Sequence, residues 1–140
     1  MIAIDTNVYV YALDDDEPDK QAKAETLFQR LLAGTGGSAV LMWQVAGELW
    51  SNLRKRESAG RIDAGDVEAH FRNFLTMFPI VVPTKRAIEG YFDLRSRFSL
   101  SHWDTMLLAA CKEAGITVLY SEDLDPGTDY DGLRVVNPFA

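Results

Sequence analysis

Short apolar runs alternate with longer segments of helical periodicity along the whole chain. The apolar runs predict strands at residues 2–4, 38–42, 80–82, 117–120 and 133–136. The periodic segments predict helices over 6–13, 19–32 and 44–57, and a fourth from Asp63 or Gly65 to Phe78. Two more helices are expected, one capped by Thr84 and ending at Phe98 and one capped by Ser101 and ending at Ala114. This alternation predicts an α/β fold with a parallel sheet covered by helices on both faces.

Four acidic residues are placed where such a fold binds ligands, at the carboxyl ends of the strands. Asp5 follows the first strand and Asp123 follows the fourth, in TVLYSED. Glu48 lies one turn into the helix after the second strand, and Asp104 lies in the first turn of SHWDTMLLAA. We expect the four carboxylates to converge on one edge of the sheet.

Each acid also has a purely structural interpretation. Asp5 can cap the helix that follows it, and Glu48 can be an exposed helix acid. Ser101 and Asp104 match a capping box, and Asp123 lies in an acidic turn. As a set, however, clustered carboxylates raise one another's pKa values and need a cation. Oxygen ligands without Cys or His indicate Mg²⁺ or Mn²⁺ rather than zinc.

Composition narrows the class of protein. The 140 residues are 47% hydrophobic and 25% charged, as in an ordinary globular domain. Fourteen Lys and Arg against 21 Asp and Glu give a net charge of −7, which argues against binding nucleic acid by bulk electrostatics and suits a basic protein partner. Cys111 is the single cysteine, and we find neither a signal peptide nor a membrane-spanning run, so we expect a cytoplasmic protein.

Several segments together carry a family resemblance: MIAIDTNVYVYALD, WQVAGELWSNL, SLSHWDTMLLAAC, and TVLYSEDL with VVNPF. In this order they resemble the PIN-domain ribonucleases, most closely the VapC-like toxins of type II toxin–antitoxin systems. The resemblance spans nearly the whole chain. It implies a single PIN domain over residues 1–140, a three-layer α/β/α sandwich with a mostly parallel sheet of four to five strands.

The resemblance also implies a function. It implies an Mg²⁺- or Mn²⁺-dependent endoribonuclease toxin that hydrolyses phosphodiester bonds in RNA, forms a homodimer and binds a cognate antitoxin. The residues that match the catalytic and metal-binding acids are Asp5, Glu48, Asp104 and Asp123. The residues that match the polar groups orienting these acids are Thr6, Asn7 and Ser121. The number of metal ions stays open. Whether Asp125 or Asp129, both in the loop after Asp123, also joins the site stays open too.

Two other functions compete with this one. The first is a catalytically inactive PIN-like module that binds a partner, against which the intact set of acids argues. The second is a phosphatase with Asp5 as nucleophile, which would typically carry a second Asp where this chain has Asn7.

A basic patch near the end of one helix also has two interpretations. Its residues are Arg54, Lys55, Arg56 and Arg61. Because Lys and Arg favour helix C-termini, we expect a solvated helix end. Contact with phosphate is the alternative.

Overall fold

The computed structural model describes residues 1–63 and 65–140, and those residues form six strands and six helices. The strands are β1 (Ile2–Ile4), β2 (Ala39–Met42), β3 (Ile80–Val81), β4 (Val118–Tyr120), β5 (Asp129–Tyr130) and β6 (Leu133–Val136). The helices are α1 (Thr6–Tyr11), α2 (Pro18–Leu32), α3 (Trp43–Ser58), α4 (Val67–Met77), α5 (Lys85–Arg97) and α6 (His102–Glu113).

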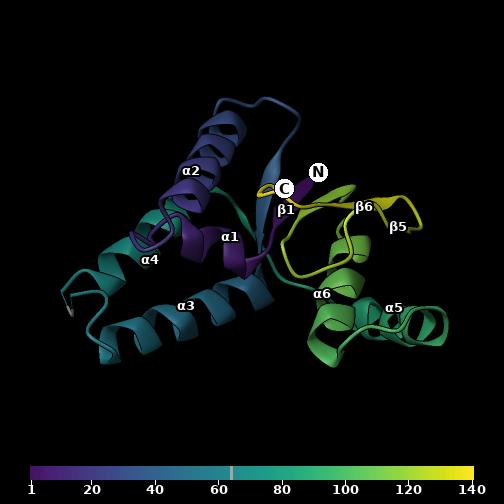
Figure 1. Cartoon of the computed structure of the whole chain (residues 1–140). Coiled ribbons are helices and arrows are strands. Elements are labelled where there is room, and N and C mark those ends of the chain that lie inside the picture. Colours follow the sequence, from purple (N-terminus) through teal and green to yellow (C-terminus); the bar gives the residue numbers. More distant parts are fainter. Residues whose placement is uncertain (64) are drawn as a thin grey trace.

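The strands form one sheet in the order β3-β2-β1-β4-β6-β5. Each neighbouring pair is parallel except β5 and β6, which are antiparallel. The chain places α1 to α4 on one face as it moves outward from β1 to β3, and places α5 and α6 on the other face as it returns to β4 (Figure 1). The carboxyl ends of β1 and β4 are therefore neighbours at the centre of the sheet.

Buried side chains hold α1, which begins directly after β1, in place against its neighbouring helices. Every residue of β1 is buried, and Tyr9 of α1 is fully buried beneath two helices. The Tyr9 ring centroid lies 4.9 Å from that of Phe28 on α2 and 5.1 Å from that of Phe74 on α4. This aromatic cluster holds α1 against its neighbours, and so holds Asp5, the residue between β1 and α1.

The α/β class, the mostly parallel sheet and the five expected strands are confirmed, and the sheet has one additional strand. β5 pairs with β6 through a two-residue turn at Asp131 and Gly132, whose φ angles are 57° and 94°. Positive φ at both positions defines the hairpin turn that Asp-Gly favours. The Asp131–Gly132 dipeptide could therefore have predicted this hairpin and its additional strand, which the pattern of apolar residues did not indicate.

Helix boundaries differ from the expected ones by a few residues. α4 begins at Val67 rather than at Asp63 or Gly65, because Asp66 N donates to Asp63 O at 2.9 Å in a turn before it. Ala64, which the earlier start would include, lies outside the described residues. Among the helices described, none has the length and apolar character needed to cross a membrane.

Candidate active site

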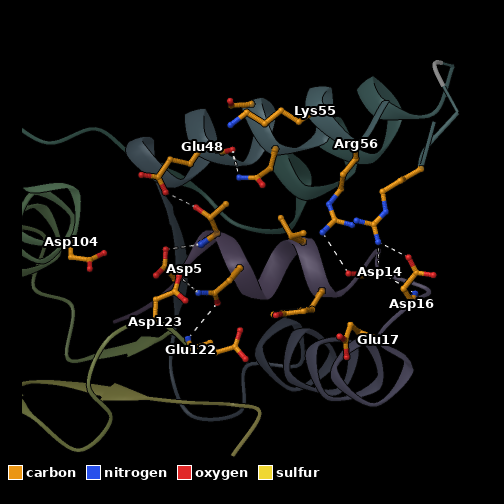
Figure 2. A pocket seen from close by; sticks show the side chains of 17 residues that line it. Asp5, Asp14, Asp16, Glu17, Glu48, Lys55, Arg56, Asp104, Glu122 and Asp123 are labelled. Atoms are coloured by element: carbon orange, nitrogen blue, oxygen red, sulfur yellow. Dashed lines mark hydrogen bonds and ion pairs between the residues drawn. The ribbon is translucent and has the colours of Figure 1, made fainter. Parts of the chain in front are cut away.

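A cleft of about 660 Å³ opens at the carboxyl ends of β1 and β4, between α3 and the α1–α2 segment (Figure 2). Seventeen residues line it, of which eight are acidic and three are basic. The four acids predicted from the sequence are all among them: Asp5, Glu48, Asp104 and Asp123. We call this part of the cleft the carboxylate end.

Asp5 is buried at the point where β1 passes into α1. Its carboxylate accepts hydrogen bonds from Thr6 N at 2.8 Å and from Ser121 Oγ at 2.7 Å, and only 6% of the residue is exposed. Burial raises its pKa to about 6, although the bonds from Ser121 and Thr6 oppose the rise and the charges of Glu48 and Asp123 add to it. Asp5 is thus both the cap of α1 and a carboxylate at the cleft whose charged form is disfavoured by burial.

Ser121 connects the first and last of the predicted acids. Its hydroxyl donates to Asp5 and accepts a hydrogen bond from Asp123 N at 3.2 Å. Asn7 holds the same loop from the other side, because its Nδ2 donates to Asp123 Oδ2 at 3.0 Å. Ser121 and Asn7 therefore bring the loop after β4 to the start of α1.

Glu48 is held by two neutral donors. Thr6 Oγ1 donates to Glu48 Oε2 and Gln44 Nε2 donates to Glu48 Oε1, both at 2.9 Å. The amide nitrogen of Gln44 also donates to the carbonyl of Trp103 at 3.0 Å, directly before Asp104. Gln44 thereby joins α3 to the first turn of α6, which carries Asp104.

Asp104 has a structural function as well as a place in the cleft. Its N–H donates to Ser101 Oγ at 3.2 Å, which confirms Ser101 as the cap of α6. No hydrogen bond joins its carboxylate to Asp5, Glu48 or Asp123 among the described residues, and Figure 2 shows it on a separate helix, to one side of them.

The loop after Asp123 contributes no further acid to the cleft. Asp125 and Asp129 are not among the lining residues. Asp125 accepts from Thr128, and Asp129 accepts from Gly132 N in the β5–β6 hairpin. In the described part of this loop, the acids that line the cleft are therefore Glu122 and Asp123.

The four predicted acids have no counter-charge of their own among the described residues, although the neighbouring Glu122 pairs with Lys20. In the part of the chain that the structure describes, no Lys or Arg forms an ion pair with Asp5, Glu48, Asp104 or Asp123. Within those same residues, no three acidic, Cys or His side chains are already arranged to hold a metal ion. The donors at this end are carboxylate oxygens, the type that hard divalent cations prefer.

The opposite part of the cleft, formed by Asp14, Asp16, Arg56 and Arg61, is internally neutralised; we call it the arginine end. Arg56 pairs with the buried Asp14 at 3.5 Å, and Arg61 pairs with Asp16 at 2.5 Å. Lys55 lines the cleft but is exposed, as a solvated helix end predicts, whereas Arg56 is half-buried and pairs with Asp14, which the expectation of a solvated helix end did not include. The expectation also holds for Arg54, which is exposed and outside the lining.

Two residues that support the cleft were not singled out from the sequence: Gln44, which holds Glu48 from outside the lining, and Asp14, which lines the arginine end. Gln44 precedes Glu48 by four positions on one helix, a spacing that places both on the same face and could have identified it. Asp14 carried no such signal, because its partners Arg56 and Arg61 lie more than forty positions away in the sequence.

Comparison with known proteins identifies the family to which this fold belongs. Residues 2–127 match the PIN domain family. The chain belongs to the PIN-domain family. Among curated proteins, no sequence matches this PIN domain.

Solved structures share the fold at low sequence identity. VapBC2 from Rickettsia felis, bound to a DNA fragment from its promoter, is 16% identical, with 98% of each chain covered and a TM-score of 0.70. A toxin–antitoxin complex from Klebsiella pneumoniae is 18% identical, with 99% of this chain and 98% of the other covered and a TM-score of 0.68. VapC20 of Mycobacterium tuberculosis, a toxin that cleaves the sarcin–ricin loop, is 20% identical, with coverage of 89% and 92% and a TM-score of 0.63.

Proposed function

We propose that this PIN domain is an Mg²⁺- or Mn²⁺-dependent endoribonuclease. The observation that carries the proposal is Asp5, a buried carboxylate that shares the cleft with Glu48, Asp104 and Asp123 and forms no ion pair with any basic residue that the structure describes. A buried anion without compensation is unfavourable, and a bound cation removes the cost. Membership of the PIN family, whose domains are typically nucleases, supports RNA hydrolysis as the reaction at this site.

The donor set fits a divalent metal of the hard class. Asp5, Asp104 and Asp123 would hold the ion directly or through water, and Glu48 would hold a second ion or orient the attacking water. A divalent ion, when bound, lowers the pKa of a water ligand and stabilises charge on the attacking and leaving oxygens. Four carboxylates carry about four negative charges, which two divalent ions would neutralise.

Neutral side-chain and main-chain donors of the protein orient Asp5 and Glu48. Thr6 and Gln44 each hold one oxygen of Glu48, and Ser121 and Thr6 N hold Asp5. These bonds leave the acids charged while fixing their direction, which is what partners of metal ligands do.

We further propose that the protein acts as the toxin of a toxin–antitoxin module and forms a homodimer. Two of the structural relatives described above are toxin–antitoxin complexes or VapBC assemblies, and VapC20 cleaves an RNA loop. The surface offers an apolar groove of about 500 Å³ between α3 and α4, lined by Trp50, Phe71 and Leu75. A clean monomer in light scattering at micromolar concentration would refute the dimer.

The competing proposal is a PIN-like module that binds a partner without turnover. The intact acids at the carboxylate end argue against it, since a module without catalysis has no need to keep uncompensated carboxylates in a cleft.

An RNA cleavage assay separates the two proposals. The wild type and Asp5→Asn are incubated with single-stranded RNA in Mg²⁺, in Mn²⁺ and in excess chelator. We expect cleavage by the wild type with either metal, none with chelator, and none by Asp5→Asn. Activity that survives both chelator and substitution would refute the metal mechanism, and a wild type inactive under all conditions would favour the binding module.

A further inference from the structure

One face of α3 connects the two ends of the cleft. The residues that α3 contributes to the lining follow helical spacing: Glu48, Ser51, Asn52, Lys55 and Arg56. All five are polar or charged, in contrast to the buried apolar face of the same helix. Eight residues of helix span about 12 Å along the axis, so Glu48 and Arg56 are too far apart to contact the same phosphate group.

The arginine end contains one fixed carboxylate and one exposed carboxylate. Asp14 is buried, and its Oδ1 accepts from Asp16 N at 3.1 Å, which holds the turn before α2. The side chain of Asp16 is 74% exposed, and that of its partner Arg61 is 46% exposed. Asp16 can therefore leave Arg61 by a side-chain rotation, whereas Asp14 cannot leave Arg56 without disturbing the turn.

We propose that the arginine end binds a backbone phosphate of the RNA strand, a neighbour of the scissile phosphate, and that Asp16 occupies Arg61 in the free protein until this phosphate displaces it. This inference rests on the proposed ribonuclease function for the identity of the strand. The polar face of α3 would guide the strand between the two ends.

Charge explains why the exchange favours a phosphate. Eight acids against three basic residues make the cleft repel a polyanion, so its few guanidinium and ammonium groups are the places where a phosphate is attracted. An exposed ion pair such as Arg61 with Asp16 is weak. A guanidinium binds phosphate with two parallel hydrogen bonds, and RNA binding also releases counterions.

The first test compares two neighbouring aspartates. Asp15 is exposed, accepts from Gln21 and does not line the cleft, so Asp15→Asn removes the same charge from the same loop without touching Arg61. Binding of a fluorescent single-stranded RNA is measured by anisotropy in the non-cleaving Asp5→Asn background. We expect Asp16→Asn to tighten binding about two- to fivefold, and Asp15→Asn to change it much less.

The second test removes the cation. Arg61→Gln should weaken binding about three- to tenfold and lower the slope of log affinity against log salt by about 0.7, the contribution of one phosphate contact in a single strand. Arg54→Gln is the matched control, because Arg54 is exposed near the C-terminal end of α3 and lies outside the cleft. In the double variant Asp16→Asn/Arg61→Gln, the gain from Asp16→Asn should disappear, since Asp16 acts through Arg61.

Several outcomes would overturn the inference. Equal tightening by Asp16→Asn and Asp15→Asn would assign the effect to net charge, and a gain that persists without Arg61 would do the same. Weaker binding by Asp16→Asn, with an unchanged circular dichroism spectrum and melting temperature, would show that the pair assists binding. RNA binding that follows the expected pattern while the wild type cleaves nothing would refute the ribonuclease proposal alone.

Discussion

Two buried aspartates lie at opposite ends of one cleft and differ in what surrounds their charge. Asp5 is 6% exposed and Asp14 is 7% exposed. Asp5 receives hydrogen bonds from neutral groups and has acidic neighbours, whereas Asp14 pairs with Arg56 and Arg61. Burial by itself therefore does not distinguish them; the nearest opposite charge does.

The difference shows how a fold separates a binding site from a structural contact. A carboxylate that the protein neutralises from within contributes to holding the loop before α2 against α3. A carboxylate that the protein buries without a cation costs stability, and it is retained where an external cation can supply the missing charge. This argument supports the proposed metal site at the carboxylate end and makes the buried pair of Asp14 and Arg56 a structural contact, which leaves Arg61, with its exposed partner Asp16, as the proposed phosphate contact.

The largest expected effect tests which acids share the carboxylate end. Asp123→Asn should lower the rate of RNA cleavage at least about a thousandfold, since the charge held by a catalytic metal contributes several kcal/mol to the transition state. Asp125→Asn, two positions along the same loop and outside the cleft, should cleave at nearly the wild-type rate. An equal loss in both variants would mean that the charge of the loop, rather than Asp123, supports cleavage.

The next effect tests the missing counter-charge at Asp5. Its pKa is about 6 in the folded protein and near 3.9 when unfolded, so between these values the folded state binds more protons. The metal-free protein should therefore lose up to about 3 kcal/mol of stability from this group as pH rises from 4 to above 6.

Urea unfolding of wild type and Asp5→Asn across this pH range measures the loss as a difference. The stability advantage of Asp5→Asn should be smallest near pH 4 and largest above pH 6.5, and Mg²⁺ should reduce it by stabilising the wild type alone. An advantage that does not change with pH would contradict the raised pKa.

Removing the charge of Asp14 should lower the stability of the protein, whereas removing the charge of Asp5 should raise it. Asp14→Asn keeps an oxygen for the bond from Asp16 N but leaves Arg56, whose side chain is 19% exposed, without its anion. Breaking such a pair should destabilise the protein by about 2 kcal/mol. Thermal unfolding of Asp14→Asn beside Asp15→Asn checks this, and a loss of stability shared by both variants would argue against the pair.

The smallest effect concerns the positioning of Glu48. Gln44→Ala removes the bond to Glu48 and the bond to the Trp103 carbonyl, and should lower the cleavage rate about tenfold. It should also raise the Mg²⁺ concentration needed for half-maximal rate. Gln29→Ala, an exposed glutamine on α2, is the control. A normal rate with a normal metal requirement would leave Gln44 a purely structural link between α3 and α6.

The parts of the fold that were predictable are those that local sequence controls. The apolar runs located five strands, and Thr84 and Ser101 were correctly identified as caps because each hydroxyl accepts from an N–H two or three positions ahead. β5 was missed because a two-residue strand has no periodicity of its own. The start of α4 was placed too early because a turn at Asp63–Asp66 and a helix share the same residue preferences.

By itself, the sequence determined that Asp5 and Asp123 follow the ends of strands and that Glu48 and Asp104 lie in the first two turns of helices, because strand ends and helix caps depend on neighbouring residues. Only the tertiary structure decided which of the buried charges are compensated. Ser121 reaches Asp5 across 116 positions, and Arg56 reaches Asp14 from another helix. A charge responds to whatever lies within a few ångströms of it, and the packing of α3 against α1 and of β4 beside β1 places those groups there.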